Sequence, residues 1–148
     1  MVLQPVQPPH ARRVLVVDDE PLVRWALSET LTTAGLSVRQ AATGDAAARA
    51  LSDEGNCPDV VLLDYRLPDT TGLDLLATIK RETPSCRTIL MTAYGTPEIA
   101  RQALQMGAVA VVDKPFEMGD VPGIVEYAFH ARLPDDPGED RARASVEP

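Results

Sequence analysis

Residues 60–64, Val-Val-Leu-Leu-Asp, decide how this chain folds. Four consecutive apolar residues, most of them branched, are typical of a strand that is buried on both faces of a parallel sheet. The run leads directly into an aspartate and then into a polar turn at residues 65–72. Ligands of open parallel sheets bind at the carboxyl edge of the strands, so Asp64 lies where chemistry is expected. Taken alone, an aspartate that merely begins a turn is an equally good interpretation.

Four other apolar runs predict strands, and helical patterns separate them. These runs lie at residues 14–17, 38–42, 88–91 and 109–112. Apolar residues recur at helical spacing near residues 21–34, 45–51, 73–82, 97–106 and 120–132. Strands that alternate with helices predict a parallel sheet with right-handed crossovers and helices on both faces. The run at 38–42 alternates with polar residues, so we expect it at an edge of the sheet.

Several residues predict where helices begin, end and bury their side chains. Gly35 and Gly107 are expected to end the first and fourth helices, and Thr43 is expected to cap the second. The buried side of the fourth helix is expected to carry, or to lie near, Ile99, Ala100, Ala103, Leu104 and Met106.

Composition restricts the classes of function. The 148 residues favour one domain, and the net charge of −8 argues against direct nucleic-acid binding by this chain, because phosphate contacts need a basic face. No apolar run approaches the roughly 20 residues that span a bilayer, and the N-terminus has no signal-peptide pattern. We therefore expect a cytoplasmic chain without membrane contacts.

The ends of the chain differ in composition from its centre. Residues 1–11 are proline-rich and are expected to form a disordered tail, whereas residues 12–133 form the ordered domain. Residues 134–148 are expected to be a disordered tail or the start of a linker. Cys57 and Cys86 precede predicted strands at the edge opposite Asp64, and we expect inert thiols in a reducing compartment.

Polar residues of reactive types end four of the five predicted strands. They are Asp18, Asp19, Asp64, Thr92 and Lys114. In a parallel sheet these side chains gather at one edge, where three carboxylates need a cation or a proton to offset their repulsion. A site with only oxygen ligands suits Mg²⁺.

The same constellation suits phosphoryl chemistry. A carboxylate such as Asp64 can act as a nucleophile and form an aspartyl phosphate. Mg²⁺ and the Lys114 ammonium would stabilise the transferring oxygens, and the Thr92 hydroxyl would donate to them. Each residue alone has an ordinary interpretation: a helix-capping acidic cluster, a turn hydroxyl or a surface lysine. Their common position at one edge favours the phosphoryl interpretation.

These motifs resemble the receiver domain of two-component response regulators. The resemblance covers about residues 13–132 and rests on VLVVDDE at 14–20, VVLLDYRLPDTTG at 60–72, ILMTAYG at 89–95 and DKPF at 113–116. It implies an α/β, flavodoxin-like three-layer sandwich, with a five-stranded parallel sheet in order 2-1-3-4-5 and five helices. Receivers of enhancer-binding, ATPase-containing transcription regulators are the most similar members of the family.

The resemblance assigns a role to each motif residue. It implies that Asp64 is the phosphoacceptor, and that Asp18, Asp19 and the backbone carbonyl of Arg66 complete its Mg²⁺ site. Lys114 would pair with the phosphoryl group.

The resemblance also covers the residues that carry the switch. Thr92 would turn its hydroxyl toward the phosphoryl group, and a cis peptide bond would precede Pro115. The family usually places Tyr or Phe three residues before the lysine, where this chain has Val111. Tyr94 is a candidate to replace part of that aromatic coupling and, with Arg66, to shield the phosphoaspartate from water.

The family's partners and activity follow from the same resemblance. The phosphodonor would be a histidine kinase or a histidine phosphotransfer protein. Receivers often pair through the face of the fourth helix, fifth strand and fifth helix, and homodimerisation of this chain through that face stays open. The chain would be a switch rather than a turnover enzyme, because it would catalyse only its own phosphorylation and slow autodephosphorylation.

Two other functions stay open. A degenerate receiver would act as a phosphorylation-independent interaction module. Val111 keeps this alternative open, although the complete set of acidic pair, Asp64, Thr92 and Lys114 argues against it. A phosphatase or phosphotransferase would use Asp18 or Asp19 as its nucleophile. The adjacency of these aspartates disfavours the enzyme, because haloacid-dehalogenase-like enzymes place their two aspartates one residue apart.

Overall fold

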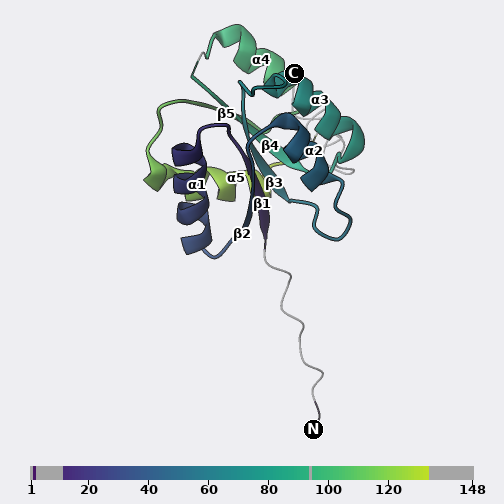
Figure 1. The fold of residues 1–148 in the computed structure, drawn as a ribbon, viewed down its shortest axis with the longest axis vertical. Coiled ribbons are helices and arrows are strands. Elements are labelled where there is room, and N and C mark those ends of the chain that lie inside the picture. The colour runs from purple at the N-terminus through teal and green to yellow at the C-terminus, as the bar shows by residue number, and fades with distance from the viewer. Residues whose placement is uncertain (1, 3–11, 94, 134–148) are drawn as a thin grey trace, which may run out of the picture.

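The computed structural model describes residues 2, 12–93 and 95–133 (Figure 1). The elements are β1 (Arg13–Val17), α1 (Pro21–Thr33), β2 (Ser37–Ala41), α2 (Gly44–Leu51), β3 (Val60–Asp64), α3 (Gly72–Glu82), β4 (Arg87–Thr92), α4 (Pro97–Gln105), β5 (Ala110–Asp113), a 3₁₀ turn η1 (Met118–Asp120) and α5 (Val121–His130). Apart from Val2, the tails expected at 1–11 and 134–148 lie outside the described residues, and so does Tyr94.

The five strands form one parallel sheet in the order β2-β1-β3-β4-β5, which confirms the predicted topology. β3 lies at the centre, and β2 is an edge strand, as its alternating pattern predicted. The register pairs Val17 with Leu63 and Asp64 with Met91. The carboxyl ends of β1, β3 and β4 therefore meet at one edge of the sheet.

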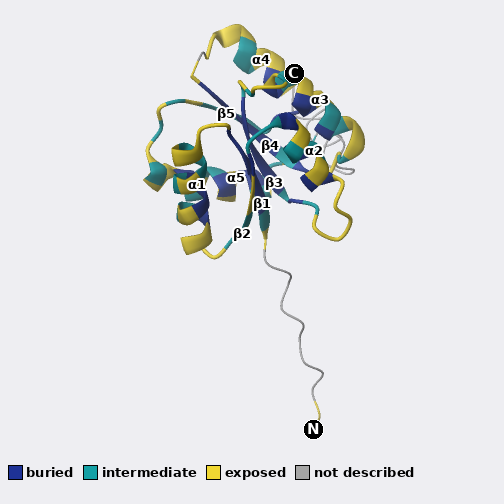
Figure 2. Cartoon of the chain, in the orientation of Figure 1, coloured by how far each residue is buried: buried dark blue, intermediate teal, exposed yellow. Residues whose placement is uncertain are grey.

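Helices cover both faces of the sheet (Figure 1). α1 and α5 pack on one face and α2, α3 and α4 on the other, which gives the three layers expected. Successive side chains of a strand point to opposite faces. Val61 and Leu63 accordingly join the core under α2 and α3, whereas Val60 and Leu62 join the core under α1 and α5. All five residues of β3 are buried, as the dark blue central strands of Figure 2 show.

The predicted helix boundaries are largely confirmed. Thr43 caps α2 by accepting a hydrogen bond from the Ala46 amide. Gly35 and Gly107 follow α1 and α4 with φ angles of +91° and +102°, a region that favours glycine. The last helix is shorter than expected, because α5 ends at His130.

One prediction about α4 is wrong. Leu104 was expected on or near the buried side, yet 51% of its surface is exposed, and Ala103 is the only fully buried residue of this helix. Ile99 and Met106 pack against the core beside Ala103 at helical spacing. A residue directly after Ala103 is rotated by about 100° around the helix, so Leu104 faces away from the core.

No described helix is both long enough and apolar enough to cross a membrane.

Thr88 provides a test of the core. Its side chain is fully buried on β4, and among the described residues its hydroxyl has no hydrogen-bond partner. An unsatisfied buried polar group is destabilising, so we expect Thr88→Val to raise the free energy of unfolding by about 1 kcal/mol. Urea denaturation measures the change. Thr32→Val, at an exposed position of α1, is the control and should stay within about 0.5 kcal/mol of the parent. A loss of stability in Thr88→Val would show that the hydroxyl is satisfied.

Candidate functional site

Three aspartates meet at the carboxyl edge of the sheet. Asp18 and Asp19 follow β1 and Asp64 ends the neighbouring β3, so the parallel register places them side by side. Each offers a carboxylate oxygen, and these oxygens lie within 4.8 Å of one another. Asp18 and Asp64 are buried, whereas Asp19 is exposed. The acidic cluster predicted from the strand ends is therefore present.

Lys114 reaches this cluster from the loop after β5. Its Nζ atom donates a hydrogen bond to Asp18 Oδ2 at 2.7 Å and lies 3.4 Å from Asp64 Oδ2. The Lys114 backbone N–H donates to the carbonyl of Thr92, the fully buried residue at the end of β4. The Lys114–Pro115 peptide bond is cis, as expected. The structure thus brings all five predicted side chains to one edge of the sheet.

The electrostatics of the cluster follow from burial and neighbouring charge. Burial, and then the negative charge of Asp18, raise the pKa of Asp64 to about 6, although Lys114 opposes this shift. Burial alone would lower the pKa of Lys114, but its hydrogen bond to Asp18 and the nearby carboxylate charges outweigh burial and raise it. One ammonium therefore offsets only part of the negative charge, and an added cation would favour the ionised form of Asp64.

The residues around the cluster fit a hard divalent cation. Carboxylate oxygens are the ligands that Mg²⁺ and Ca²⁺ prefer, and the three aspartates supply them close together. A hollow of about 260 Å³ opens beside them to receive a ligand. It is lined by Asp19, Glu20, Asp64, Tyr65, Arg66, Ala93 and Lys114.

Backbone hydrogen bonds hold Asp18 in place. Its N–H donates to the carbonyl of Ala41 at 3.1 Å, and its Oδ1 accepts from the Glu20 N–H at 2.9 Å. Arg24, one turn into α1, donates to the Asp18 carbonyl at 2.8 Å. We did not predict this role of Arg24, because no sequence motif distinguishes it from a surface arginine on a helix.

The loop after Asp64 is fixed from both sides. On the inner side, the Gly72 N–H donates to the Tyr65 carbonyl at 2.6 Å. On the outer side, the Asp69 carboxylate accepts hydrogen bonds from the N–H groups of Gly44 and Asp45, at 2.8 and 2.9 Å. These two bonds lower the pKa of Asp69. Asp69 was missed because an aspartate after proline in a turn usually bonds within its own turn.

The structure describes two of the three other positions that the sequence singled out, Arg66 and Val111. Arg66 is exposed, and its N–H lies 3.5 Å from Asp64 Oδ1, so the loop keeps its backbone close to the cluster. The role of the Arg66 carbonyl as a metal ligand stays a prediction. Val111 is half-buried on β5 and packs against the core under α2, α3 and α4. The roles expected of Tyr94 lie outside the described residues.

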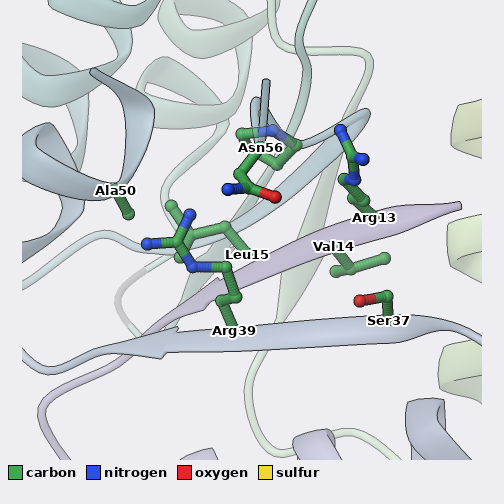
Figure 3. Close-up of a pocket in the computed structure, with 8 residues that line it drawn as sticks. Arg13, Val14, Leu15, Ser37, Arg39, Ala50 and Asn56 are labelled. Atoms are coloured by element: carbon green, nitrogen blue, oxygen red, sulfur yellow. The ribbon is translucent and has the colours of Figure 1, made fainter. Parts of the chain in front are cut away.

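A second cavity, at the opposite edge of the sheet, is too small for an organic ligand (Figure 3). Its volume is about 40 Å³, close to that of one water molecule. Its lining residues are Arg13, Val14, Leu15, Ser37, Arg39, Ala50, Asn56 and Pro58. Both arginines already have partners, since Arg13 donates to the Gly55 carbonyl and Arg39 pairs with Asp53. The candidate functional site is therefore the acidic edge.

Comparisons with known proteins match most of the chain. The family model described as response regulator receiver domain matches residues 14–126. The chain is 37% identical over 116 residues to the DNA-binding transcriptional regulator NtrC of Proteus hauseri, a match that covers 78% of this chain and 24% of the relative. The chain therefore spans about a quarter of the length of that relative.

Two solved structures are similar along most of their length. The receiver domain of NtrX from Brucella abortus has a TM-score of 0.74 and 31% identity, and the match covers 80% of this chain and 99% of that one. A response regulator from Burkholderia pseudomallei, solved with a phosphorylated aspartic acid, a calcium ion and citrate, has a TM-score of 0.70 and 26% identity. That match covers 90% of this chain and 72% of the other.

The raised pKa of Asp64 predicts how stability depends on pH. Because the folded state holds the Asp64 proton more tightly than the unfolded state does, this residue contributes stability below about pH 4 that is lost as the pH rises through about 6. Without divalent cations, Asp64→Asn should therefore exceed the parent in stability at pH 7.5 by on the order of 1 kcal/mol. The difference should vanish toward pH 4. Urea denaturation across this range measures it, and a constant difference at every pH would contradict the prediction.

Gly72 predicts how tightly the loop packs beneath Asp64. A Cβ atom at this position would lie 2.7 Å from the Asp64 carbonyl oxygen and 2.8 Å from Leu90 Cδ1. We expect Gly72→Ala to lower the free energy of unfolding by about 2 kcal/mol, since backbone cannot yield easily to overpacking. Gly123→Ala is the control, because Gly123 is exposed in α5 with no atom near its absent Cβ. That substitution should stabilise the protein by about 0.5 kcal/mol. Thermal denaturation of both variants distinguishes these effects.

Proposed function

This chain belongs to the response regulator receiver domain family, and we propose that it is a phosphorylation-dependent switch that accepts a phosphoryl group on Asp64. The observation that carries the proposal is the position of the Asp64 carboxylate. It lies close to the acidic pair Asp18–Asp19 and 3.4 Å from the Lys114 ammonium, beside a hollow of about 260 Å³. Such an arrangement serves the transfer of an anionic group to a carboxylate.

Asp64 is suited to act as the nucleophile. Its pKa of about 6 leaves it mainly ionised at neutral pH, so an oxygen lone pair is available to attack phosphorus. With a phosphohistidine donor, the new P–O bond forms as the P–N bond breaks, and the imidazole leaves with a proton. The Lys114 ammonium, 3.4 Å from Asp64 Oδ2, is placed to stabilise the charge on the transferred oxygens.

The aspartates have a second task in this proposal. Asp18, Asp19 and Asp64, with the carbonyl of Arg66, would hold Mg²⁺. When bound there, Mg²⁺ would neutralise the carboxylates and polarise the phosphoryl oxygens. The Burkholderia pseudomallei relative carries a phosphorylated aspartic acid together with a calcium ion, which supports this combination of ligands.

We expect the phosphodonor and the response to phosphorylation to be those of other receiver domains. Histidine kinases or histidine phosphotransfer proteins would be the phosphodonors, and we expect them to meet this chain in the cytoplasm. Thr92 ends β4 opposite Asp113 in the register, so movement of its side chain would be passed to the start of the β5–α5 segment. Control of transcription through further domains, as in NtrC, is part of the proposal, because the chain matches only a quarter of that relative.

Homodimerisation through α4, β5 and α5 is a further part of the proposal. Leu104 on α4 and Tyr127 on α5 are large apolar residues with 51% and 60% of their surfaces exposed. Exposed apolar side chains on these two helices are available to contact a second copy of the chain. Val111, in place of an aromatic residue on the intervening strand, would make the coupling between Thr92 and this face weaker than in other receivers.

Of the two nucleophiles that the enzyme alternative allows, Asp18 is disfavoured by its surroundings, whereas Asp19 is exposed and is tested by turnover alone. Asp18 Oδ2 accepts from Lys114 and its Oδ1 accepts from the Glu20 N–H, and its side chain is fully buried. A carboxylate with both oxygens engaged is a poor nucleophile. The degenerate-receiver alternative rests on Val111 alone, because the rest of the constellation is complete.

Intact mass tests the proposal directly. Incubation with acetyl phosphate and Mg²⁺ should add one phosphoryl group of about 80 Da, and chelation of the metal should prevent the addition. Asp64→Asn should show no addition. Asp45→Asn, an exposed aspartate on α2, is the matched control and should be phosphorylated like the parent.

Two outcomes would overturn the proposal. Absence of the added mass, even with a histidine kinase as donor, would leave the phosphorylation-independent interaction module as the function. Repeated turnover of a small phosphoester such as p-nitrophenyl phosphate would instead identify a phosphatase.

A further inference from the structure

We propose that Cys57 and Cys86 form a reversible intramolecular disulfide that ties together the amino ends of β3 and β4. They are the only two cysteines of the chain, and their Sγ atoms lie 3.7 Å apart. Cys57 is half-buried in the loop before β3, and Cys86 is fully buried immediately before β4. The sequence predicts inert thiols, whereas the contact between the two sulfurs in the fold favours a disulfide.

The backbone fixes the positions from which the two sulfurs meet. Val60 pairs with Arg87 in the register of β3 and β4, and the Arg87 N–H donates to the Asp59 carbonyl at 3.0 Å. The strand ends that carry the cysteines are therefore held side by side. A disulfide requires the sulfurs to approach by about 1.7 Å more, a movement that side-chain torsions on adjoining segments can supply.

Both thiols lie close to the carbonyl oxygen of Pro58. Cys86 Sγ donates a hydrogen bond to the Pro58 carbonyl at 2.8 Å, and Cys57 Sγ lies 3.8 Å from the same oxygen. Metal binding does not explain the pair, since the aspartates 18, 19 and 64 form the only group of three or more metal-ligand side chains within the described ranges. Two thiols without a third ligand fit covalent coupling to each other.

The two thiols differ in their exposure to solvent, and this difference determines which of them reacts with an oxidant first. Burial, and then the neighbouring Cys57, raise the pKa of the Cys86 thiol to about 12, so Cys86 is a poor first nucleophile. Cys57 is the more accessible sulfur and meets the oxidant first. Cys86 then reacts only with the sulfur already beside it.

A small disulfide such as oxidised glutathione supplies the oxidising equivalents. The Cys57 thiolate attacks one glutathione sulfur, forms a mixed disulfide and releases the first glutathione thiolate. The Cys86 sulfur, as it gives up its proton, attacks Cys57 Sγ and displaces the second glutathione thiolate, which takes up a proton. Two protein thiols are oxidised to one disulfide, and one glutathione disulfide is reduced to two thiols.

The disulfide would stabilise the segment that carries Asp64. It closes a loop over residues 57–86, which contains β3, the loop after Asp64, and α3. Closing a loop of this size restricts the unfolded chain and should raise the melting temperature by about 5–10 °C. Asp64 lies at the far end of β3, about 15 Å along the strand, so its own surroundings stay unchanged.

Titration of the folded protein with oxidised and reduced glutathione tests this inference. The oxidised protein should lose about 2 Da, resist alkylation by N-ethylmaleimide and melt about 5–10 °C higher, and dithiothreitol should reverse all three changes. Cys86→Ser should stop at one glutathione adduct of about 305 Da on Cys57, whereas Cys57→Ser should stay unmodified.

Three results would overturn it. The first is that the folded parent accumulates glutathione adducts and forms no internal disulfide. The second is that the folded parent stays unmodified while the urea-unfolded chain is oxidised. The third is that the oxidised form melts no higher than the reduced form. None of these measurements depends on phosphorylation of Asp64, so the inference and the proposed function fail or succeed separately.

Discussion

Repulsion between the buried carboxylates of Asp18 and Asp64 is the constraint around which the carboxyl edge of the sheet is arranged. Both side chains are nearly inaccessible to water, and burial with mutual repulsion raises the pKa of Asp64 to about 6. The Lys114 ammonium offsets part of this repulsion, because it lies 2.7 Å from Asp18 and 3.4 Å from Asp64. The site is thus destabilised in a way that a bound cation or protonation of Asp64 would relieve.

Pairing of the strands that carry the charges offsets this electrostatic repulsion. β3 is buried along its whole length and pairs with β1 and β4, so the three strand ends are held in fixed register. Gly72 and Asp69 hold the next loop from opposite sides, the first against the backbone of residues 64–65 and the second against α2. A rigid sheet keeps like charges together that would separate on a flexible loop.

Local patterns were sufficient to predict a parallel sheet with the polar strand ends gathered at one edge, whereas the strand order came from the resemblance to receiver domains. Apolar runs that end in Asp64 or Thr92 define strand positions, and the parallel arrangement then brings their ends together. Contacts between helices and loops could not be predicted, since the bonds from the Gly44 N–H to Asp69 and from Arg24 to the Asp18 carbonyl depend on three-dimensional distance. Leu104 was misplaced because its helical spacing gives no measure of how wide a stripe α4 buries.

The two edges of the sheet have different chemistry because of the same two strands. β3 and β4 end in Asp64 and Thr92 at the carboxyl edge, and the segments that lead into them bring Cys57 and Cys86 into contact at the amino edge. A covalent bond at the amino edge would restrict unfolding of these strands without adding charge to the carboxyl edge. If both proposals hold, stability and signalling would respond to different inputs, since thiol oxidation would act on the unfolded ensemble and phosphorylation would act on the charge balance of the folded state. The separation follows from the parallel sheet itself, which places all strand beginnings on one side and all strand ends on the other.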